Sequence, residues 1–251
     1  MTSMKLAVAA CISATLANAN LRLPSPTTFL QEKPDPRLAS SVQEFFTLTV
    51  GDDGTTMSTQ SGDIKQLGGN RVQIIDDTFV SDYINVGFWD YDEELERPKD
   101  APKDGSSTKD ESLKLYFLMA ESRGDPDTDP LVIWLNGGPG CSSMLGLFTE
   151  NGPYNFKFDA EHVKDPFVLE KNDFSWNSEA NVMYVDQPLG TGFSFVDSIR
   201  SFRFTEAQLA EDFYIFLHNF MVKYPKFRGR EIIITGESFA GHYIPVMART
   251  L

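Results

Sequence analysis

The chain has 251 residues, of which 41% are hydrophobic and 12% aromatic, and this composition indicates a folded domain with a sizeable core. Its formal net charge of -14 argues against a nucleic-acid partner and against an anionic membrane surface, because phosphates repel a strongly acidic protein. We therefore expect neither partner. Neutral or cationic ligands are easier to accommodate.

The first 19 residues have the pattern of a secretory signal peptide. Lys5 precedes an apolar run from Leu6 to Leu16, and Ala17-Asn18-Ala19 follows as a small-residue cleavage site. No later stretch has the roughly 18 consecutive apolar residues that a membrane-spanning helix needs. We predict cleavage after Ala19, no membrane span in the mature chain, and a destination in the secretory pathway, either extracellular or in a vacuole or lysosome.

Residues 20–70 are rich in Pro, Ser, Thr, Gly and Asp, which predicts a leader or propeptide-like arm ahead of a domain at 71–251. Within that domain, β-forming residues alternate over 72–88 and 113–121 and indicate an antiparallel pair of strands. The segment from Asp90 to Ser112 is charged and contains prolines, so we expect an exposed loop there.

Three short apolar runs, each followed closely by Gly or Pro, are typical of parallel strands that are buried on both faces. They span residues 131–135, 181–185 and 232–235. Between the last two runs, residues 205–224 carry apolar side chains at helical spacing, with Thr205 and Gln208 in a capping-box pattern. Strand, helix and strand in this order predict a crossover and an α/β fold with a mostly parallel sheet.

The first motif with chemical meaning comes directly after the run at 232–235. It reads Gly236-Glu237-Ser238-Phe239-Ala240-Gly241, and its small residues allow a sharp reversal from strand into helix. Such a reversal exposes the Ser238 hydroxyl and places N–H groups of the helix start around it. We interpret it as a nucleophile elbow, although Ala240 stands where the generic pattern has its last glycine. The alternative is a serine in an ordinary turn of small residues.

The second motif begins at the end of the run at 131–135 and reads Trp134-Leu135-Asn136-Gly137-Gly138-Pro139-Gly140-Cys141-Ser142-Ser143. Consecutive glycines let a backbone approach a substrate closely, and acyl transfer needs N–H groups aimed at the developing oxyanion. A phosphate-binding loop is the alternative, but the segment contains neither G-K-[ST] nor G-x-G-x-x-G. The motif therefore indicates an oxyanion-binding loop.

These two motifs, together with the segment from Asp186 to Ser194, closely resemble the serine carboxypeptidase family from about residue 75 onward. The resemblance implies an α/β-hydrolase fold and release of single residues from peptide or protein C-termini through an acyl-enzyme, with no cofactor and no metal. It also implies site residues: the nucleophile Ser238, the oxyanion-hole N–H groups of Gly138 and Phe239, and a site for the substrate's terminal carboxylate at Asn136, Glu150 and Glu237.

The chain departs from the resemblance after the elbow. α/β-Hydrolases place the acid and the histidine of the catalytic triad after the serine, yet only a short tail follows Ser238. We therefore expect a fragment that is truncated after the elbow and inactive by itself. Cys141 is the one cysteine after the signal peptide, so it bonds to something outside this chain or the chain is incomplete. The family pairs this cysteine with a later one, which implies that its disulfide partner is absent here.

Other candidates for the missing base and acid are weaker. His242 lies one helical turn beyond Ser238 and is expected to have a structural role, while His162 and His218 are expected to be solvated. Asp186 ends a strand, but a turn-stabilising role fits its position before the serine better. Two other functions stay open: an acyltransferase of the same family, and a secreted protein that binds peptides without cleaving them. The sequence defines neither the preferred side chain at the cleaved position nor the oligomeric state.

Overall fold

A computed structural model describes residues 64–68, 71–74, 76–90, 113–158 and 167–251. The predicted signal peptide, most of the predicted arm, the predicted loop beyond Asp90 and His162 lie outside the described residues. In the described ranges, no helix is long and apolar enough to cross a membrane.

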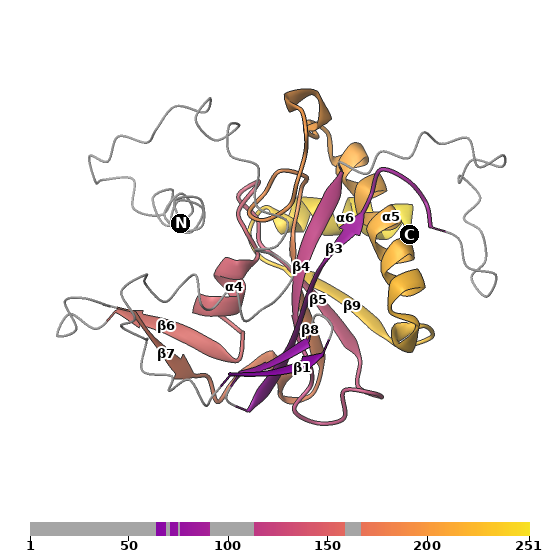
Figure 1. Ribbon diagram of the computed structural model, residues 1–251. Helices are drawn as coiled ribbons and strands as arrows, with labels where there is room; N and C mark the ends of the chain where they lie inside the picture. Colours follow the sequence, from indigo (N-terminus) through magenta and orange to yellow (C-terminus); the bar gives the residue numbers. More distant parts are fainter. Residues whose placement is uncertain (1–63, 69–70, 75, 91–112, 159–166) are drawn as a thin grey trace.

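Seven strands form one sheet through the centre of the molecule (Figure 1). Their order is β1-β2-β3-β4-β8-β5-β9. Neighbours pair antiparallel from β1 to β4 and between β4 and β8, whereas β5 is parallel to both β8 and β9. The predicted α/β arrangement with an N-terminal antiparallel pair is confirmed, and the antiparallel part is larger than predicted. The strands are β1 (Ile64–Gly68), β2 (Arg71–Ile74), β3 (Asp77–Asn85), β4 (Lys114–Ala120), β5 (Leu131–Leu135), β8 (Asn181–Asp186) and β9 (Ile232–Gly236).

The sheet begins earlier in the chain than the sequence indicated. Residues 64–68, which we assigned to the arm, form β1 and pair with β2. The segment expected as one strand over 72–88 is divided into β2 and β3, because the chain turns at Asp76 and folds back on itself. The pairing of β3 with β4 is the antiparallel pair that the alternation predicted.

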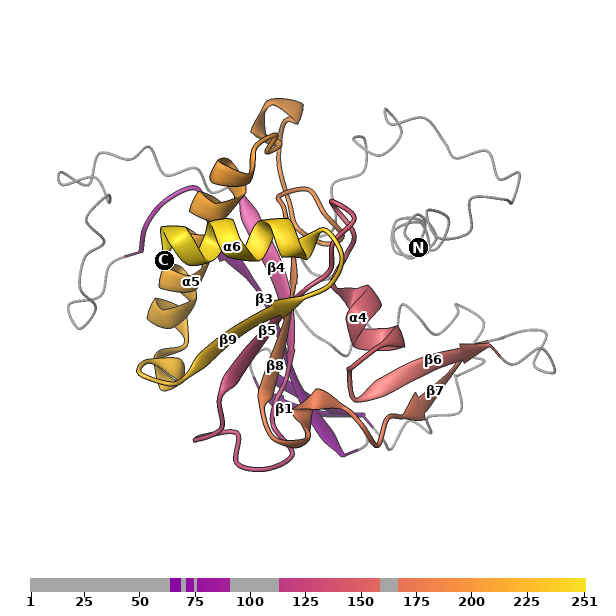
Figure 2. The same cartoon turned by 180° about the vertical axis from the view of Figure 1, so that it is seen from behind.

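Helices and a small hairpin cover the two faces of this sheet (Figures 1 and 2). Alternate residues of β4 belong to two separate core clusters, as the two-residue period of a strand requires. Phe117 and Met119 pack with α5 and α6, whereas Tyr116 and Leu118 pack on the side of α4. The covering elements are α4 (Met144–Thr149), β6 (Tyr154–Phe158), β7 (Phe167–Lys171), α5 (Glu206–Lys223) and α6 (Ala240–Thr250), with 3-10 turns η1 (Trp176–Ser178), η2 (Ile199–Ser201) and η3 (Pro225–Phe227).

Helix α5 forms where the sequence predicted it. The Thr205 hydroxyl oxygen accepts a hydrogen bond from the Gln208 N–H, and the Gln208 side chain accepts one from the Thr205 N–H, which completes the capping box. Helix α5 ends before Pro225, because a proline lacks the N–H that would continue the helix, and η3 begins at this proline. The buried face of α5 carries Phe213, Phe216 and Phe220.

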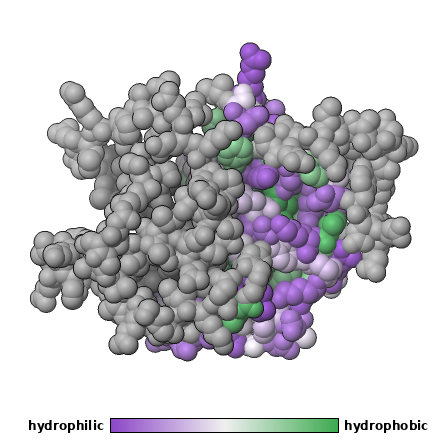
Figure 3. All heavy atoms as spheres, viewed as in Figure 1, coloured by the Kyte–Doolittle hydropathy of each residue, from purple (hydrophilic) through white to green (hydrophobic). Residues whose placement is uncertain are grey.

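Two predictions about burial are wrong. Ile232 and Ile233 of β9 are 37% and 40% exposed, because β9 ends the strand order and no described strand pairs with its outer edge. His218 is half-buried rather than solvated, since its Nε2 lies 2.9 Å from the Asp90 carbonyl oxygen and its ring packs edge-on against Trp89. Elsewhere, the described surface on the face shown in Figure 3 is mostly hydrophilic.

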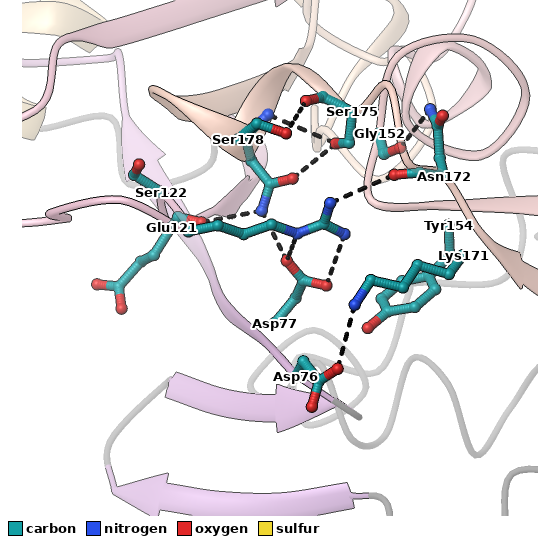
Figure 4. Close-up of polar contacts among 12 residues, drawn as sticks. Asp76, Asp77, Glu121, Ser122, Gly152, Tyr154, Lys171, Asn172, Ser175 and Ser178 are labelled. Atoms are coloured by element: carbon teal, nitrogen blue, oxygen red, sulfur yellow. Dashed lines mark hydrogen bonds and ion pairs between the residues drawn. The ribbon is translucent and has the colours of Figure 1, made fainter.

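A buried ion-pair network holds the end of the sheet where β3 begins and β4 ends (Figure 4). Asp77 accepts hydrogen bonds from Arg123 at 2.8 and 3.0 Å and from the Asn177 amide at 2.8 Å. Asn177 also donates to the Glu121 carbonyl at 3.0 Å and so joins η1 to the end of β4. Burial by itself would raise the pKa of Asp77, but hydrogen bonds from Arg123, Asn177 and Tyr154 outweigh it and lower this pKa.

Replacing Arg123 with Met should lower the free energy of unfolding by about 3 kcal/mol near neutral pH, because it leaves the Asp77 carboxylate buried without a cation. The folded-state pKa of Asp77 is lowered, so this contribution is complete above the usual value of 3.8 and is lost as the pH falls through the folded-state value. Denaturant unfolding at several pH values measures it. The exposed Arg200→Met is the control. If Arg123→Met lowered the free energy of unfolding by the same amount in strong acid as at neutral pH, the ion pair between Arg123 and Asp77 would not be the cause.

Candidate active site

Ser238 lies in a sharp turn between β9 and α6. It is the one non-glycine residue in the described ranges with a positive φ, which is 55°. Such a backbone costs about 1–3 kcal/mol and persists only where the surrounding packing enforces it. A Cβ on Gly236 would lie 2.7 Å from the Ala240 Cβ and 2.4 Å from the Leu135 carbonyl oxygen. No side chain therefore fits at position 236, two residues before Ser238, which is itself exposed, and the predicted sharp turn is confirmed.

The glycine-rich loop after β5 lies directly against this turn. A Cβ on Gly137 would lie 2.5 Å from the backbone nitrogen of Phe239, so the two backbones touch here and only glycine fits. Gly138 has a φ of 110°, which also favours glycine. In the part of the chain that the structure describes, neither the Gly138 N–H nor the Phe239 N–H donates a hydrogen bond. An oxyanion hole requires donors that are available in this way, so both N–H groups stay candidates for it.

Asn136 connects the end of β5 with two glutamates. Its Nδ2 donates to Glu150 Oε1 at 3.3 Å and to Glu237 Oε1 at 3.0 Å. Its Oδ1 accepts from Trp134 Nε1 at 2.8 Å and from the Gly146 N–H at 3.1 Å. These two donors fix the orientation of the amide, so its NH2 group faces both carboxylates. The three residues predicted for carboxylate recognition therefore lie in one cluster, which we call the Asn136 cluster.

The two glutamates of the Asn136 cluster crowd one another electrostatically. The pKa of Glu150 is raised, first by burial and then by the charge of Glu237, while the hydrogen bond from Asn136 opposes the shift. No Lys or Arg of the described ranges forms an ion pair with either glutamate. A proton on Glu150 would relieve the repulsion, in line with its raised pKa.

Asp186 lies completely buried at the end of β8, where the glycine-rich loop and the loop at 187–194 meet. Its carboxylate accepts hydrogen bonds from the Ser142 hydroxyl at 2.6 Å, the Ser143 N–H at 2.9 Å and the Phe193 N–H at 2.8 Å. Burial raises the pKa of Asp186 to about 6, although these hydrogen bonds oppose the rise. The predicted turn-stabilising role is confirmed, but the sequence did not show that two loops meet on this side chain.

In the described ranges, neither of the other candidates, His242 and Cys141, forms a hydrogen bond with the Ser238 hydroxyl. His242 is exposed on α6, where its ring stacks on Phe239 at 4.6 Å and its Nδ1 lies 3.7 Å from Glu206 Oε1. These contacts support a structural role. Cys141 is half-buried within the glycine-rich loop, and its disulfide stays a prediction. Across the described residues, no group of three or more His, Cys, Asp or Glu side chains could hold a metal ion.

Sequence reasoning missed two side chains that hold the site together. Tyr243 on α6 is 1% exposed, and its hydroxyl oxygen accepts a hydrogen bond from the Gly140 N–H at 3.3 Å, which ties the elbow helix to the glycine-rich loop. No local pattern pointed to this contact. Trp134 orients the Asn136 amide, and here a signal existed, because residues two apart on a strand share one face.

Residues 105–251 match the family model of the serine carboxypeptidases, and the chain belongs to this family. It is 49% identical over 134 residues to serine carboxypeptidase S10 family member 1 of Dictyostelium discoideum and 49% identical over 136 residues to a serine carboxypeptidase-like protein of Oryza sativa subsp. japonica. These alignments cover 53% and 54% of this chain and 30% of each relative. The chain thus spans about 30% of the length of these relatives.

The fold is also similar to the crystal structure of a prohormone-processing carboxypeptidase from Saccharomyces cerevisiae. The TM-score is 0.52 and the sequence identity 29%, and the match covers 91% of this chain and 39% of the yeast chain. The expected α/β-hydrolase fold is therefore confirmed for this part of the molecule.

Replacing Glu237 with Gln should lower the pKa of Glu150 towards its usual value of 4.5, because it removes the neighbouring charge. The pKa should stay above that value, since the larger cause, burial, is unchanged. Carbon-13 NMR titration of the side-chain carboxyl measures the shift. The exposed Glu231→Gln is a matched control that should leave the pKa of Glu150 unaltered. An identical Glu150 titration in both variants would show that the two glutamates do not interact.

Proposed function

We propose that this chain is the nucleophile-bearing part of a serine-type carboxypeptidase that removes residues from peptide C-termini through an acyl-enzyme on Ser238. The observation that carries the proposal is the position of the Asn136 cluster: one of its members, Glu237, directly precedes the exposed Ser238. Because Glu237 and Ser238 are neighbours, a peptide whose terminal carboxylate lies at the cluster presents its last peptide bond to the hydroxyl. Bonds further inside the peptide are out of reach.

In the proposed reaction, Ser238 Oγ attacks the last peptide carbonyl, and the N–H groups of Gly138 and Phe239 stabilise the oxyanion. The terminal amino acid leaves with a proton, and water then releases the acyl group from Ser238. No described histidine contacts the hydroxyl. We assign the base to a histidine oriented by an aspartate in the part of the complete protein that this chain does not include.

Recognition of the substrate carboxylate requires a proton in the Asn136 cluster. Both N–H bonds of the Asn136 amide already point to Glu150 and Glu237, and ionised glutamates can only accept hydrogen bonds. Like charges about 4 Å apart repel by roughly 4 kcal/mol at an effective dielectric constant near 20. The raised pKa of Glu150 supports a protonated glutamate that donates to the substrate carboxylate.

The proposal includes export through the secretory pathway, supported by the signal-peptide pattern of residues 1–19. The predicted destination is extracellular or a vacuole or lysosome, and the acidity of a vacuole or lysosome would keep the proton in the Asn136 cluster. The peptide C-termini on which the protein acts would then be those of other proteins in that compartment.

A serine-directed fluorophosphonate should label the complete protein at Ser238, and Ser238→Ala should abolish labelling and lower kcat by about 10⁴-fold or more. The proposed acyl-enzyme forms on this hydroxyl, so its removal leaves the probe without its target. Mass spectrometry of the labelled peptide locates the adduct. Ser201→Ala removes a hydroxyl elsewhere and should keep both labelling and activity. Peptidase activity of Ser238→Ala close to that of the wild type would exclude the proposed nucleophile.

KM for a peptide with a free C-terminal carboxylate should rise from pH 4 to pH 8. The pKa of Glu150 is raised above 4.5, so the proton is present in acid and is lost as the pH rises. The matching peptide amide carries no terminal charge and should show a flatter KM profile. Glu150→Gln supplies a donor at every pH and should flatten the profile of the carboxylate peptide. Parallel KM profiles for the two wild-type substrates would refute the Asn136 cluster as the carboxylate site.

A further inference from the structure

Asp186 is the buried carboxylate on which the two loops of the site converge. One of its oxygens accepts hydrogen bonds from Ser142 and Ser143, and the other accepts one from the Phe193 N–H. No Lys or Arg of the described ranges forms an ion pair with it. A buried charge without a cation is costly, so the donors of the two loops are what stabilise it.

The hydrogen bonds from Ser142 and Ser143 to Asp186 hold the C-terminal end of the glycine-rich loop, and the Ser143 hydroxyl joins that end to the start of the loop. The Ser143 hydroxyl accepts a hydrogen bond from the Asn136 N–H at 3.1 Å and donates one to the Val185 carbonyl at 2.6 Å. The first and last residues of the loop at 136–143 therefore meet at the end of β8, next to Asp186. The carboxylate holds the closing end of the loop that contains the proposed oxyanion donor.

The second loop, at 187–194, folds directly over the same carboxylate. A Cβ on Gly192 would lie 2.1 Å from Asp186 Oδ2, so no side chain fits between them. The Ser194 hydroxyl donates to the Asp186 carbonyl and accepts a hydrogen bond from the Tyr116 N–H at 2.8 Å. The carboxylate is enclosed between β4 and the two loops. A change in its hydrogen bonds would therefore shift both loops.

We propose that Asp186 is a positioning residue for acyl transfer: by fixing the closing end of the glycine-rich loop, it aims the Gly138 N–H at the point where the oxyanion forms next to Ser238. This inference rests on the proposed function. An asparagine at this position must turn its NH2 group either towards the Ser142 hydroxyl and the Ser143 N–H or towards the Phe193 N–H. Two donors then face each other, and one loop must shift.

The test compares two ligands of the complete protein that differ only at the reacting carbon, a peptide aldehyde and the peptide alcohol of the same sequence. Ser238 Oγ adds to the aldehyde carbon, and the carbonyl oxygen of the resulting hemiacetal occupies the oxyanion position and takes up the serine proton. The alcohol binds without this bond. Asp186→Asn should weaken aldehyde binding by about 10-fold or more, because removal of a whole oxyanion donor costs about 10²–10³. Alcohol binding should change by less than about 3-fold.

Asp77→Asn is the matched control, because Asp77 is also a fully buried carboxylate surrounded by donors but lies at the opposite end of the sheet. It should weaken neither ligand selectively, even if it lowers stability. Ser142→Ala removes a single hydrogen bond to Asp186 and should weaken aldehyde binding by a few-fold in the same direction. If Asp186→Asn does not fold, Ser142→Ala decides on the same criterion.

Equal losses for aldehyde and alcohol, or an unchanged ratio of their Kd values, would overturn the positioning role while the proposed function stands. A wild-type protein that binds the aldehyde no more tightly than the alcohol would instead overturn the proposed function, and the assignment of Asp186 would fall with it. The two failures are therefore distinguishable from the wild-type measurement alone.

Discussion

The site depends on a close approach of two backbones. The segments that leave β5 and β9 touch where a Cβ on Gly137 would lie 2.5 Å from the backbone nitrogen of Phe239. Since β5 and β9 are parallel neighbours, their carboxyl ends meet at the same edge of the sheet. The contact brings the glycine-rich loop to Ser238, and it brings Asn136 within 3.0 Å of Glu237. The elbow, the oxyanion donors and the carboxylate cluster thus share one steric condition, the absence of a side chain at position 137.

Two carboxyl groups of this edge have raised pKa values; burial is the main cause for both, but their neighbours differ. Burial and a neighbouring carboxylate act on Glu150, whose partner Glu237 comes from another strand end. Burial acts on Asp186, but three donors around it favour the charged form. The surroundings of Glu150 favour its protonated form at the place where a substrate carboxylate would bind. Those of Asp186 make it a rigid acceptor, and a side chain that accepts three hydrogen bonds in a closed space is suited to holding loops in place.

Features that depend on local chemistry could be predicted from the sequence. The capping box of α5, the three parallel strands and the elbow all follow from spacing and residue type within short segments. Features that depend on distant partners could not. The burial of His218 depends on Asp90, 128 positions earlier. We expected β9 to be buried on both faces, but it lies at the end of the strand order, and the order of strands does not follow from the residues of β9 itself. Asn136 and Glu237 lie 101 positions apart, so their proximity was expected from the family resemblance and not from any pattern.

The carboxylates at the two ends of the sheet differ in whether they have cationic partners. Where β3 begins, the buried carboxylates have cationic partners: Asp77 pairs with Arg123, and Glu121 pairs with Arg71 and Lys226. At the carboxyl ends of β5, β8 and β9, the carboxylates of Glu150, Glu237 and Asp186 have no such partner among the described residues. Hydrogen bonds lower the pKa of Asp77 despite its burial, whereas burial raises the pKa values of Glu150 and Asp186. The ion pairs of Asp77 and Glu121 therefore lie at the opposite end of the sheet from Ser238 and take no part in the proposed chemistry.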